Sequence, residues 1–425
     1  MPKIAGWGNY PQINIHKNNI INNITFDDKR LNSCIARGLG RSYGDASLSE
    51  NIFIDKNKNV ISFDIKTGIL KATASLTISD LNLITVPHGW IVPVSPGTSN
   101  VTLGGMIASD VHGKNHHKDG SFSNFVYEIK LFIGSDFLNV KKGSDLFKAT
   151  LGGMGLTGII TEVKIQLKKI TSTNIYKENF SFSSIERCLD LFTKFELSSY
   201  SVCWLDFFSN KNKTMGIFSV GEHSNDSLLS DKKFFALNIP FKTPSFLIND
   251  KFVEVFNKIY FKKNKNYKKS IHIKNFFYPL DGIKNWNNLY GNNGLIQFQF
   301  VLPEEDFLKN FIYIKIFLQQ NSILPYLAVL KKFGPGNNNF LSFPLQGYTL
   351  ALDFKNSINT RYLLSQLSDY IITNGGRFYL TKDSILTEQQ FKQSYSKWER
   401  FQFVREKYNL FQFQSLLSRR LGLNR

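Results

Sequence analysis

The chain has 425 residues, of which 42% are hydrophobic and 14% aromatic, so it can bury a large core and is not an intrinsically disordered chain. Lysine and arginine number 52 against 33 aspartate and glutamate residues. The net charge of +19 favours an anionic partner such as a phospholipid surface, a nucleic acid or a phosphorylated substrate. No run of about 18 apolar residues occurs and the N-terminus lacks the apolar region of a secretory signal, which predicts a cytoplasmic protein without a transmembrane helix.

The first 170 residues alternate short apolar runs with glycine-containing turns, a texture typical of an α+β fold with short strands. Helical periodicity in this part is confined to residues 78–89 and 144–151. From about Thr171 the apolar segments become longer and richer in aromatic residues. An antiparallel sheet with helices on one face is predicted by the strand-like runs 294–303, 311–320 and 347–354 and the helix-like run 358–376.

Basic residues concentrate in Lys258–Lys274, where acidic residues are absent and seven lysines alternate with Ile259, Tyr260, Phe261 and Tyr267. A solvated loop, docking on an anionic lipid surface and nucleic-acid binding each explain such a segment. No helix-turn-helix, zinc-finger or RNP motif accompanies the charge, so we expect no nucleic-acid partner. The surrounding residues 221–275 have weak periodicity and high charge, and we predict a mobile insert there.

The segment Pro96–Phe122 combines closely spaced glycines with three histidines, His112, His116 and His117. Such glycines let backbone amides approach a ligand, and histidines beside them orient polar groups and move protons. The histidine spacing also resembles a zinc site, but Gly113 disfavours the helix that would bring His112 and His116 onto one face, so we expect no metal. The segment therefore predicts a cofactor-binding loop joined to an active site.

Two further glycine strings match known motifs but stand in the wrong context. The GxGxxG at 153–158 precedes a strand-like segment, whereas a Rossmann fingerprint follows a strand and opens a helix. The GxSxG at 40–44 also runs into a strand-like segment, where a nucleophile elbow needs a helix. We therefore reject the Rossmann and esterase interpretations and expect both strings to form loops beside a ligand.

Polar residues interrupt several apolar strands. Gln297 and Gln299 alternate with phenylalanines, so they face the same way and could line a polar pocket. Lys331 and Lys382 lie at the ends of apolar runs, just before turn-like residues. A lysine in such a place is usually solvated, but beside a pocket it can hold a phosphate or an oxyanion. The residues alone leave both alternatives open.

Taken together, the loops at 36–45, 96–126 and 151–160 resemble the flavin-binding domain of the vanillyl-alcohol-oxidase superfamily. Their order and spacing are most similar to the decaprenylphosphoryl-β-D-ribose oxidase family. The resemblance thins at Ser209–Lys274 but includes five other segments: 276–291, 295–303, 331–348, 375–384 and 417–423.

The resemblance implies an α+β fold with a two-part, PCMH-type FAD-binding domain at residues 1–172. An antiparallel-sheet substrate domain at residues 173–376 would cap it, and residues 377–425 would return to the first domain. FAD would bind noncovalently, in contact with Gly38, Leu39, Gly40, Arg41, Ser42, Tyr43, Gly44, Gly97, Thr98, Thr102, Gly104, Gly105, Ser109, His112, Gly113, Asn115, Gly158, Ile159 and Tyr379. The substrate would contact Tyr290, Gln297, Gln299, Lys331, Ala351 and Lys382, and the catalytic residues would be Lys382, Tyr43 and His112.

Two positions depart from the family pattern. Ala351 stands where some relatives carry a cysteine facing the flavin. Alanine there would leave sugar oxidation intact and remove any reaction with thiol-directed electrophiles. Ser109 also stands where relatives have cysteine, a small change from which we expect little consequence.

The implied activity is the oxidation of the C2 hydroxyl of a ribofuranose joined through phosphate to a polyprenol, with hydride passing to flavin N5. It would be the first half of an epimerisation to arabinose in cell-envelope biosynthesis, completed by a separate keto-reductase. A lipid substrate would bring the protein to an anionic membrane surface as a peripheral enzyme. The alternatives are a soluble alditol or aldonolactone oxidase of the same superfamily and a flavin-free basic membrane-binding protein.

Overall fold

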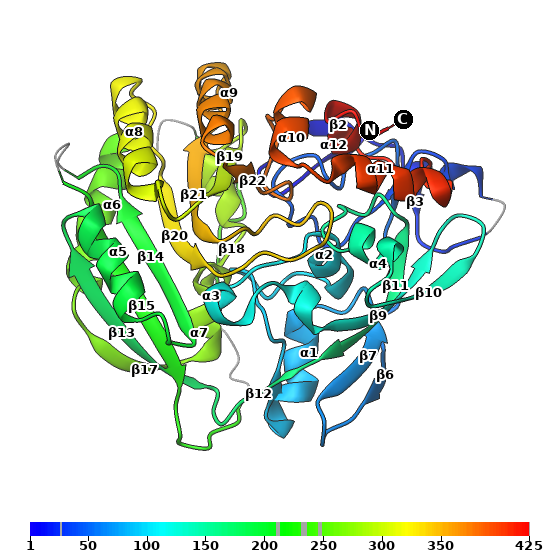
Figure 1. The fold of residues 1–425 in the computed structure, drawn as a ribbon, viewed down its shortest axis with the longest axis horizontal. Helices are drawn as coiled ribbons and strands as arrows, with labels where there is room; N and C mark the ends of the chain where they lie inside the picture. The colour runs from blue at the N-terminus through cyan, green and yellow to red at the C-terminus, as the bar shows by residue number, and fades with distance from the viewer. Residues whose placement is uncertain (26–27, 210–212, 231–235, 245–248, 425) are drawn as a thin grey trace.

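A small parallel sheet and a five-stranded antiparallel sheet form the N-terminal part of the molecule (Figure 1). The computed structural model describes residues 1–25, 28–209, 213–230, 236–244 and 249–424. The small sheet has the order β3 (Ile20–Ile21), β5 (Asn51–Phe53), β4 (Cys34–Ala36), and a separate two-stranded sheet consists of β1 (Lys3–Ala5) and β2 (Gln12–Asn14). Ile35 and Ile52 are fully buried, so the small sheet contributes directly to the core.

The five-stranded sheet carries the short helices of the N-terminal part. Its order is β10 (Phe137–Lys141), β9 (Val126–Phe132), β11 (Ile159–Gln166), β7 (Ile69–Thr73), β6 (Val60–Phe63), and β8 (Trp90–Ile91) pairs with β12 (Lys168–Lys169) nearby. Sequence periodicity predicts α1 (Ile78–Thr85) and α4 (Asp145–Thr150), but it misses α2 (Leu103–Ala108) and α3 (His116–Asp119). These two helices are too short to show an apolar period, and α2 forms where the Thr102 hydroxyl caps the amide of Gly105.

An eight-stranded antiparallel sheet forms the second large layer. Its order is β17 (Lys268–His272), β13 (Asn174–Phe182), β15 (Met215–His223), β14 (Tyr200–Asp206), β20 (Leu327–Phe333), β21 (Gly347–Lys355), β19 (Leu295–Leu302), β22 (Arg377–Phe378). Ring contacts of Phe192 with Phe218 and of Phe307 with Tyr348 join the sheet to its helices. One face is covered by α5 (Ile185–Lys194), α8 (Phe307–Gln320) and α9 (Ile358–Thr373), and the mixed α+β class is confirmed. The prediction of a strand at 311–320 is wrong, because this run lies in α8, whose residues Phe307, Phe311 and Ile314 are buried at helical spacing. Helix α6 (Asp250–Asn264) contacts the other face of the sheet through Trp204.

The predicted insert at 221–275 has more regular structure than its sequence suggests. It contains α6 (Asp250–Asn264), the edge strand β17, and β16 (Leu237–Asn238), which pairs with β18 (Ile283–Lys284); α7 (Ile273–Phe277) follows. The sequence of α6 shows only weak periodicity because its apolar residues lie on two sides of the helix, one buried and one exposed. The parts of the insert at 231–235 and 245–248 lie outside the described residues.

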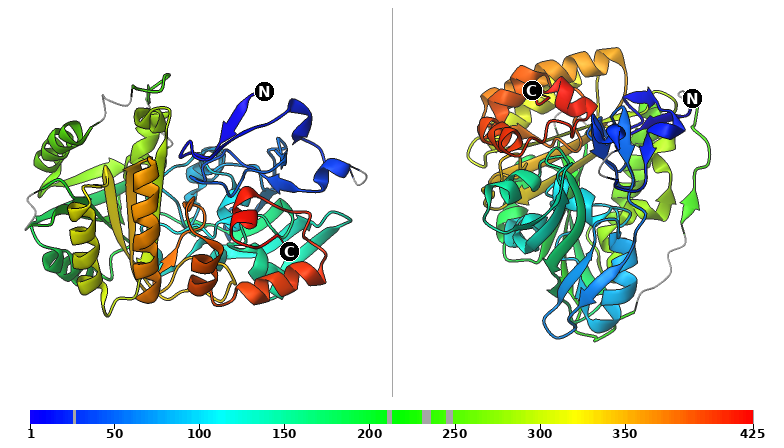
Figure 2. Two further views of the ribbon diagram at one scale, coloured as in Figure 1. Left: turned by 90° about the horizontal axis from the view of Figure 1, so that it is seen from above. Right: turned by 90° about the vertical axis from the view of Figure 1, so that its right-hand side faces the viewer.

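The C-terminal segment packs on the N-terminal part, as Figure 2 shows for the red helices. It contains α10 (Glu388–Ser394), α11 (Trp398–Lys407) and α12 (Leu416–Arg420). Backbone hydrogen bonds of 3.0 Å join Cys34 of β4 to Gln412 and Gln414. The fully buried guanidinium of Arg405 donates to the carbonyls of Leu156, Phe413 and Leu423.

The predicted domain boundaries at 172/173 and 376/377 stay a prediction. Strand β22 begins at Arg377 and still pairs with β19 of the large sheet before the chain turns to the N-terminal part. The described residues also contain the 3-10 helices η1 (Lys17–Asn19), η2 (Lys29–Leu31), η3 (Val86–His88), η4 (Phe122–Phe125), η5 (Pro279–Gly282) and η6 (Trp286–Tyr290). None of the described helices has both the length and the apolar character needed to cross a bilayer.

Candidate active site

The first glycine-rich loop, residues 38–44, follows β4 and is held against the segment after β22. The amide of Tyr43 donates to the Thr381 carbonyl at 2.9 Å. A Cβ on Gly44 would lie 1.9 Å from the Asp383 carbonyl oxygen, so only glycine allows this close approach. The loop therefore holds Tyr43 beside residues 381–383, which follow β22.

A second loop precedes α2 and is fixed by an acidic residue far along the chain. The Thr98 hydroxyl donates to Oδ1 of Asp281. Both the amide and the hydroxyl of Ser99 donate to Oδ2 of the same carboxylate at 2.8 Å. Asp281 thus holds the backbone of this loop from the other half of the molecule.

The two loops pack on each other and border open space. A Cβ on Gly38 would lie 2.5 Å from Thr102 Oγ1, so the first loop touches the cap of α2 directly. No heavy atom lies within 4 Å of a Cβ built on Gly97, and only Thr102 Oγ1 lies that close to one on Gly105. Leu39, at the tip of the first loop, is 49% exposed. Backbone groups and one apolar side chain therefore line a space that a planar, polar ligand could fill.

A third loop, residues 109–115 between α2 and α3, carries His112, and this side chain contacts the large sheet. Its Nε2 lies 3.0 Å from Nε2 of Gln299, and the same amide group donates to Thr349 Oγ1 at 3.2 Å. Because the Thr349 hydroxyl donates to the Phe300 carbonyl, its oxygen accepts from Gln299, and this fixes the orientation of the amide. His112 Nε2 is then the acceptor and Nδ1 carries the proton. Among the described residues, the buried Nδ1 has no hydrogen-bond partner.

The surroundings of His112 keep its imidazole neutral. The ring centroid lies 4.8 Å from that of Phe333 and 5.2 Å from that of Tyr379. Burial, with further contributions from the positive charge of Lys331 and from His116, holds the pKa of His112 well below its usual range. His112 is therefore suited to donate a hydrogen bond from Nδ1 rather than to supply a positive charge.

Strands β19, β20 and β21 present several polar side chains on the face that is turned towards the N-terminal part. Gln297 is paired with Asp353, and Gln299 with Ala351, as the period-two alternation predicts. Ala351 also pairs with Val329 of β20, so Val329 lies on the same face as Gln299 and Ala351. The polar and small residues that share the face are Gln297, Gln299, Lys331, Thr349, Ala351 and Asp353.

Lys382, Tyr43 and Asp353 form the charged centre of the site. Lys382 Nζ lies 3.8 Å from the centroid of the Tyr43 ring. Burial lowers the pKa of Lys382, a shift that the nearby Asp353 carboxylate opposes and Lys331 increases. Burial likewise raises the pKa of Asp353, whose Oδ1 accepts a 2.5 Å hydrogen bond from Gln297. Burial lowers the pKa of Lys331 to about 8. The site thus holds amines that are partly neutral near physiological pH.

Arg420 of α12 connects the two segments that carry Tyr43 and Lys382. Its guanidinium contacts Asp45 at 2.8 Å and Asp383 at 2.9 Å, and both carboxylates are buried. Asp45 lies two residues after Tyr43, and Asp383 directly follows Lys382. The two carboxylates raise the pKa of Arg420, so the guanidinium stays charged.

The structure brings most of the residues expected in the site together and leaves a few apart. Tyr290 is buried beside Tyr43 and Leu295, with its ring stacked on Tyr326 at 6.0 Å. Ile159 instead begins β11 opposite Phe132 of β9 in the five-stranded sheet, and Gly158 directly precedes it against the Phe132 carbonyl. The assignment of this pair to the cofactor stays a prediction.

Sequence reasoning missed several residues that build the site. Asp353 had a readable signal, because it lies two residues after Ala351 on a strand and so shares its face. Asp281 and Arg420 had none, because their partners lie 183 and 375 positions away in the chain. These contacts arise from the tertiary fold, which no local sequence pattern records.

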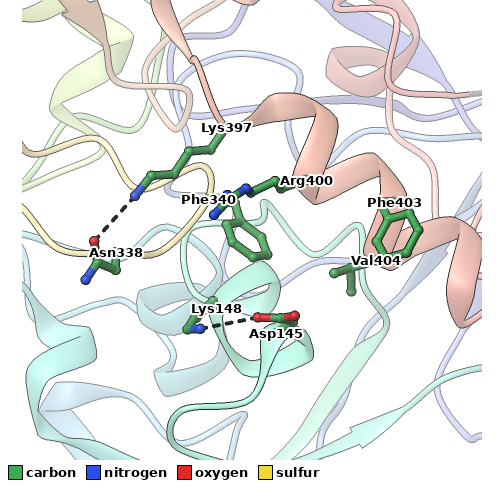
Figure 3. A pocket seen from close by; sticks show the side chains of 8 residues that line it. All are labelled: Asp145, Lys148, Asn338, Phe340, Lys397, Arg400, Phe403 and Val404. Carbon is green, nitrogen blue, oxygen red and sulfur yellow. Dashed lines mark hydrogen bonds and ion pairs between the residues drawn. The ribbon is translucent and has the colours of Figure 1, made fainter.

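A cavity of about 500 Å³ opens away from these residues, between α4 and α11 (Figure 3). It is lined by Asp145, Lys148, Asn338, Phe340, Lys397, Arg400, Phe403 and Val404. None of the expected site residues lines this cavity, and we assign it no part in the reaction. Within the described ranges, no group of three or more histidine, cysteine or acidic residues is arranged to hold a metal ion.

The residues of the three loops fit FAD. The space beside Gly97 and Gly105 would admit phosphate groups close to the backbone, and the exposed Leu39 would pack on a ring system. The buried Nδ1–H of His112 requires an acceptor, which a polar ring edge supplies.

Comparison with known proteins agrees with this fit. A family model described as FAD binding domain matches residues 25–135. The chain is 33% identical over 383 residues to the decaprenylphosphoryl-beta-D-ribose oxidase of Mycolicibacterium smegmatis, covering 85% of this chain and 83% of that protein. It is 24% identical over 371 residues to an uncharacterised protein of Streptomyces coelicolor, covering 82% of this chain and all of that protein. The D-lactate dehydrogenase of Archaeoglobus fulgidus is 26% identical over 139 residues, which is 31% of each chain.

The fold, the loops and the family model define an FAD-dependent oxidoreductase that acts on a CH–OH group. Similarity to the mycobacterial oxidase extends over most of both chains and so is not confined to the residues that the FAD-binding family model matches. The chain belongs to the decaprenylphosphoryl-β-D-ribose oxidase family.

Proposed function

We propose that this protein oxidises the C2 hydroxyl of a ribofuranose linked through phosphate to a polyprenol, giving the 2-keto sugar. The supporting observation is the extent of similarity, which covers 85% of this chain for the ribose oxidase but 31% for a D-lactate dehydrogenase. The shorter match is as expected for relatives that share the cofactor domain and differ in the domain that selects the substrate.

FAD, when bound noncovalently by the three loops, supplies the acceptor for the hydride of the carbinol carbon. Gly97 would place its backbone amide near the phosphates, and Gly104 and Gly105, whose amides donate to the Ala74 carbonyl and to Thr102 Oγ1, would contribute by lacking side chains. His112 would donate from Nδ1 to the ring system. His112 remains neutral in this role, because its pKa is well below its usual range.

Lys382 is the proposed acceptor of the hydroxyl proton. Its lowered pKa gives a fraction of neutral amine near physiological pH, which an ordinary lysine lacks. The Tyr43 ring below the amine holds Nζ in place and would stabilise the ammonium once the proton has arrived. Lys331, with a pKa of about 8, stays largely cationic at pH 7 and would hold the substrate phosphate.

The remaining polar face would orient the sugar. Gln297 and Gln299 present amide groups whose positions are fixed by Asp353, His112 and Thr349. Ala351 places a methyl group among them where some relatives have a thiol, so sugar oxidation would proceed without a nucleophile at this position. A ring hydroxyl held by these amides would present its carbon to the cofactor in one orientation.

The product defines two proposed partners. A 2-keto sugar becomes an arabinose only after a second enzyme returns hydride from the opposite face, so a keto-reductase would complete the epimerisation for cell-envelope biosynthesis. The polyprenyl chain of the substrate resides in a bilayer, so the enzyme would work as a peripheral protein at an anionic membrane surface.

Anaerobic bleaching of the flavin absorbance by a panel of sugars tests the proposal. Polyprenyl-phosphate ribose should bleach the flavin, while the arabinose epimer and free alditols should not. Bleaching by free alditols or aldonolactones instead would replace the proposal with a soluble sugar-alcohol oxidase. A purified protein that takes up no FAD at all would contradict both.

A further inference from the structure

Helix α6 carries an exposed apolar stripe that the rest of the described chain does not cover. Phe252, Val255, Phe256 and Ile259 are 52%, 56%, 55% and 62% exposed. Their spacing of three and four residues places them on one side of the helix. Scattered exposed apolar residues are normal on a protein surface, but a contiguous stripe of large ones marks a binding surface.

The opposite side of α6 is anchored to the large sheet. Asn257 donates to Asp206 of β14 at 2.7 Å, and the Tyr260 ring contacts Trp204 at 4.8 Å between centroids. Val253 is buried on the same side. The helix therefore cannot bury the exposed stripe by rotating without losing these contacts. Tyr260, which the sequence suggested as an interfacial residue, is instead part of the anchor.

Lysines flank the apolar stripe. The segment 250–269 holds seven lysines and two acidic residues, and one of these acids, Glu254, is paired with Lys258 at 2.6 Å. On a helix of 3.6 residues per turn, Lys258 and Lys262 lie along one border of the stripe and Lys263 lies in line with it. Lysines of this kind bury their stems in an interface and keep the ammonium among headgroups.

We propose that this side of α6 docks on the surface of a bilayer that contains anionic lipids, with Phe252, Phe256 and Ile259 entering the acyl boundary. An apolar stripe flanked by lysines is complementary to such a surface in both apolar area and charge. The inference assigns the membrane contact to a specific helix, and it rests on the proposed function only for the lipid nature of the substrate.

The position of α6 links the membrane to the substrate side of the site. Trp204 pairs with Val329, and Val329 pairs with Ala351, so α6 lies over the sheet face that carries the polar site residues. At its N-terminal end, Asp250 accepts a hydrogen bond from Tyr326, whose ring stacks on Tyr290. A bilayer docked at α6 would therefore lie on the side of the sheet that carries Gln299, Lys331 and Ala351.

Flotation of the FAD-loaded enzyme with phosphatidylcholine vesicles, with and without phosphatidylglycerol, tests the docking. The wild type should bind only the vesicles with phosphatidylglycerol. A variant with Phe252→Ser, Phe256→Ser and Ile259→Ser should lose more than tenfold in binding. Phe403→Ser is the matched control, because Phe403 is 66% exposed on α11 at the other end of the molecule, and it should bind normally (Figure 1).

A variant with fewer lysines tests the electrostatic part of the docking independently. Replacing Lys258, Lys262 and Lys263 with glutamine should weaken binding to the anionic vesicles on the order of a hundredfold, from about fivefold per lysine near an anionic surface. Neither variant should change the rate of flavin reduction by a short-chain, water-soluble substrate analogue, because all of these residues are exposed.

Three outcomes would overturn the docking: serine variants that bind as tightly as wild type, wild type that ignores anionic vesicles, and a dimer in solution that the serine variant converts to a monomer. The last outcome would assign the stripe to a second copy of this chain. Vesicle binding in an enzyme that no polyprenyl sugar reduces would leave the docking intact and refute the proposed substrate instead.

Discussion

Arg420→Met removes the guanidinium that joins the Tyr43 segment to the Lys382 segment. The carboxylates of Asp45 and Asp383 are 5% and 3% exposed, so the variant leaves two buried negative charges without their cation. Removing one partner of a buried ion pair costs about 3–5 kcal/mol. Because the Arg420 side chain is 23% exposed and water can replace part of it, we expect the lower end, about 3 kcal/mol of unfolding free energy.

The same change should slow flavin reduction beyond its effect on stability. Repulsion between Asp45 and Asp383 would separate the loops and move Nζ of Lys382 from the Tyr43 ring. A displacement of about 1 Å at a reacting group lowers rates about a hundredfold. Denaturant titration measures the loss of stability, and stopped-flow bleaching of the flavin at saturating substrate measures the reduction rate on protein that is still folded.

Two variants separate positioning from folding. Arg419→Met removes an exposed ion pair with Glu50, so it should cost under about 1 kcal/mol and leave the reduction rate unchanged. Adding Asp45→Asn and Asp383→Asn to Arg420→Met should restore part of the stability, since no buried charge is then left unpaired, while reduction stays slow. A wild-type reduction rate in folded Arg420→Met would refute the positioning role.

Lys382→Ala should keep FAD bound but abolish turnover, and near-normal turnover would remove Lys382 from the mechanism. In the wild type the reduction rate should rise with pH and reach a plateau, because the proton acceptor is the neutral amine; the lowered pKa places this rise below the ordinary lysine pKa of about 10.4, and a rate that falls through this range would contradict it. Gly97→Ala meets no heavy atom within 4 Å, so it should fold normally and weaken FAD binding, as an FAD titration would show, whereas unchanged affinity would place the phosphates elsewhere. Gly44→Ala, whose Cβ would lie 1.9 Å from a carbonyl oxygen, should lose stability even without FAD.

Alternating strand patterns in the sequence predicted much of the fold. The alternation in 294–303 predicted both a strand and its polar face, and Gln297 and Gln299 do lie together there. The glycine loops predict a ligand site because few other structures need so many glycines in so few residues, and the FAD-binding family model covers the first two of them. Local sequence is enough in these cases because the physical requirement is itself local.

Other features depend on contacts that no local pattern records. Helix α2 has glycines at two of its six positions and forms because Thr102 caps it and Leu103, Met106 and Ile107 are buried. The apolar periodicity of α6 is weak because some of its apolar residues pack on the sheet while others lie on an exposed side of the helix. The sequence around Arg420 does not indicate its ion pairs, because Asp45 and Asp383 reach it only in the folded chain.

The contact between Arg420 and Asp45 also sets an order of events during synthesis. The two residues are 375 positions apart, so at 5–20 residues per second the ribosome needs about 20–75 seconds between them. Throughout that interval the glycine loops and the edge of β4 lack the segment that later covers them. A nascent chain would therefore expose its cofactor loops long before it can hold them in place, and a protein cut before residue 420 would keep the loops but lose their clamp.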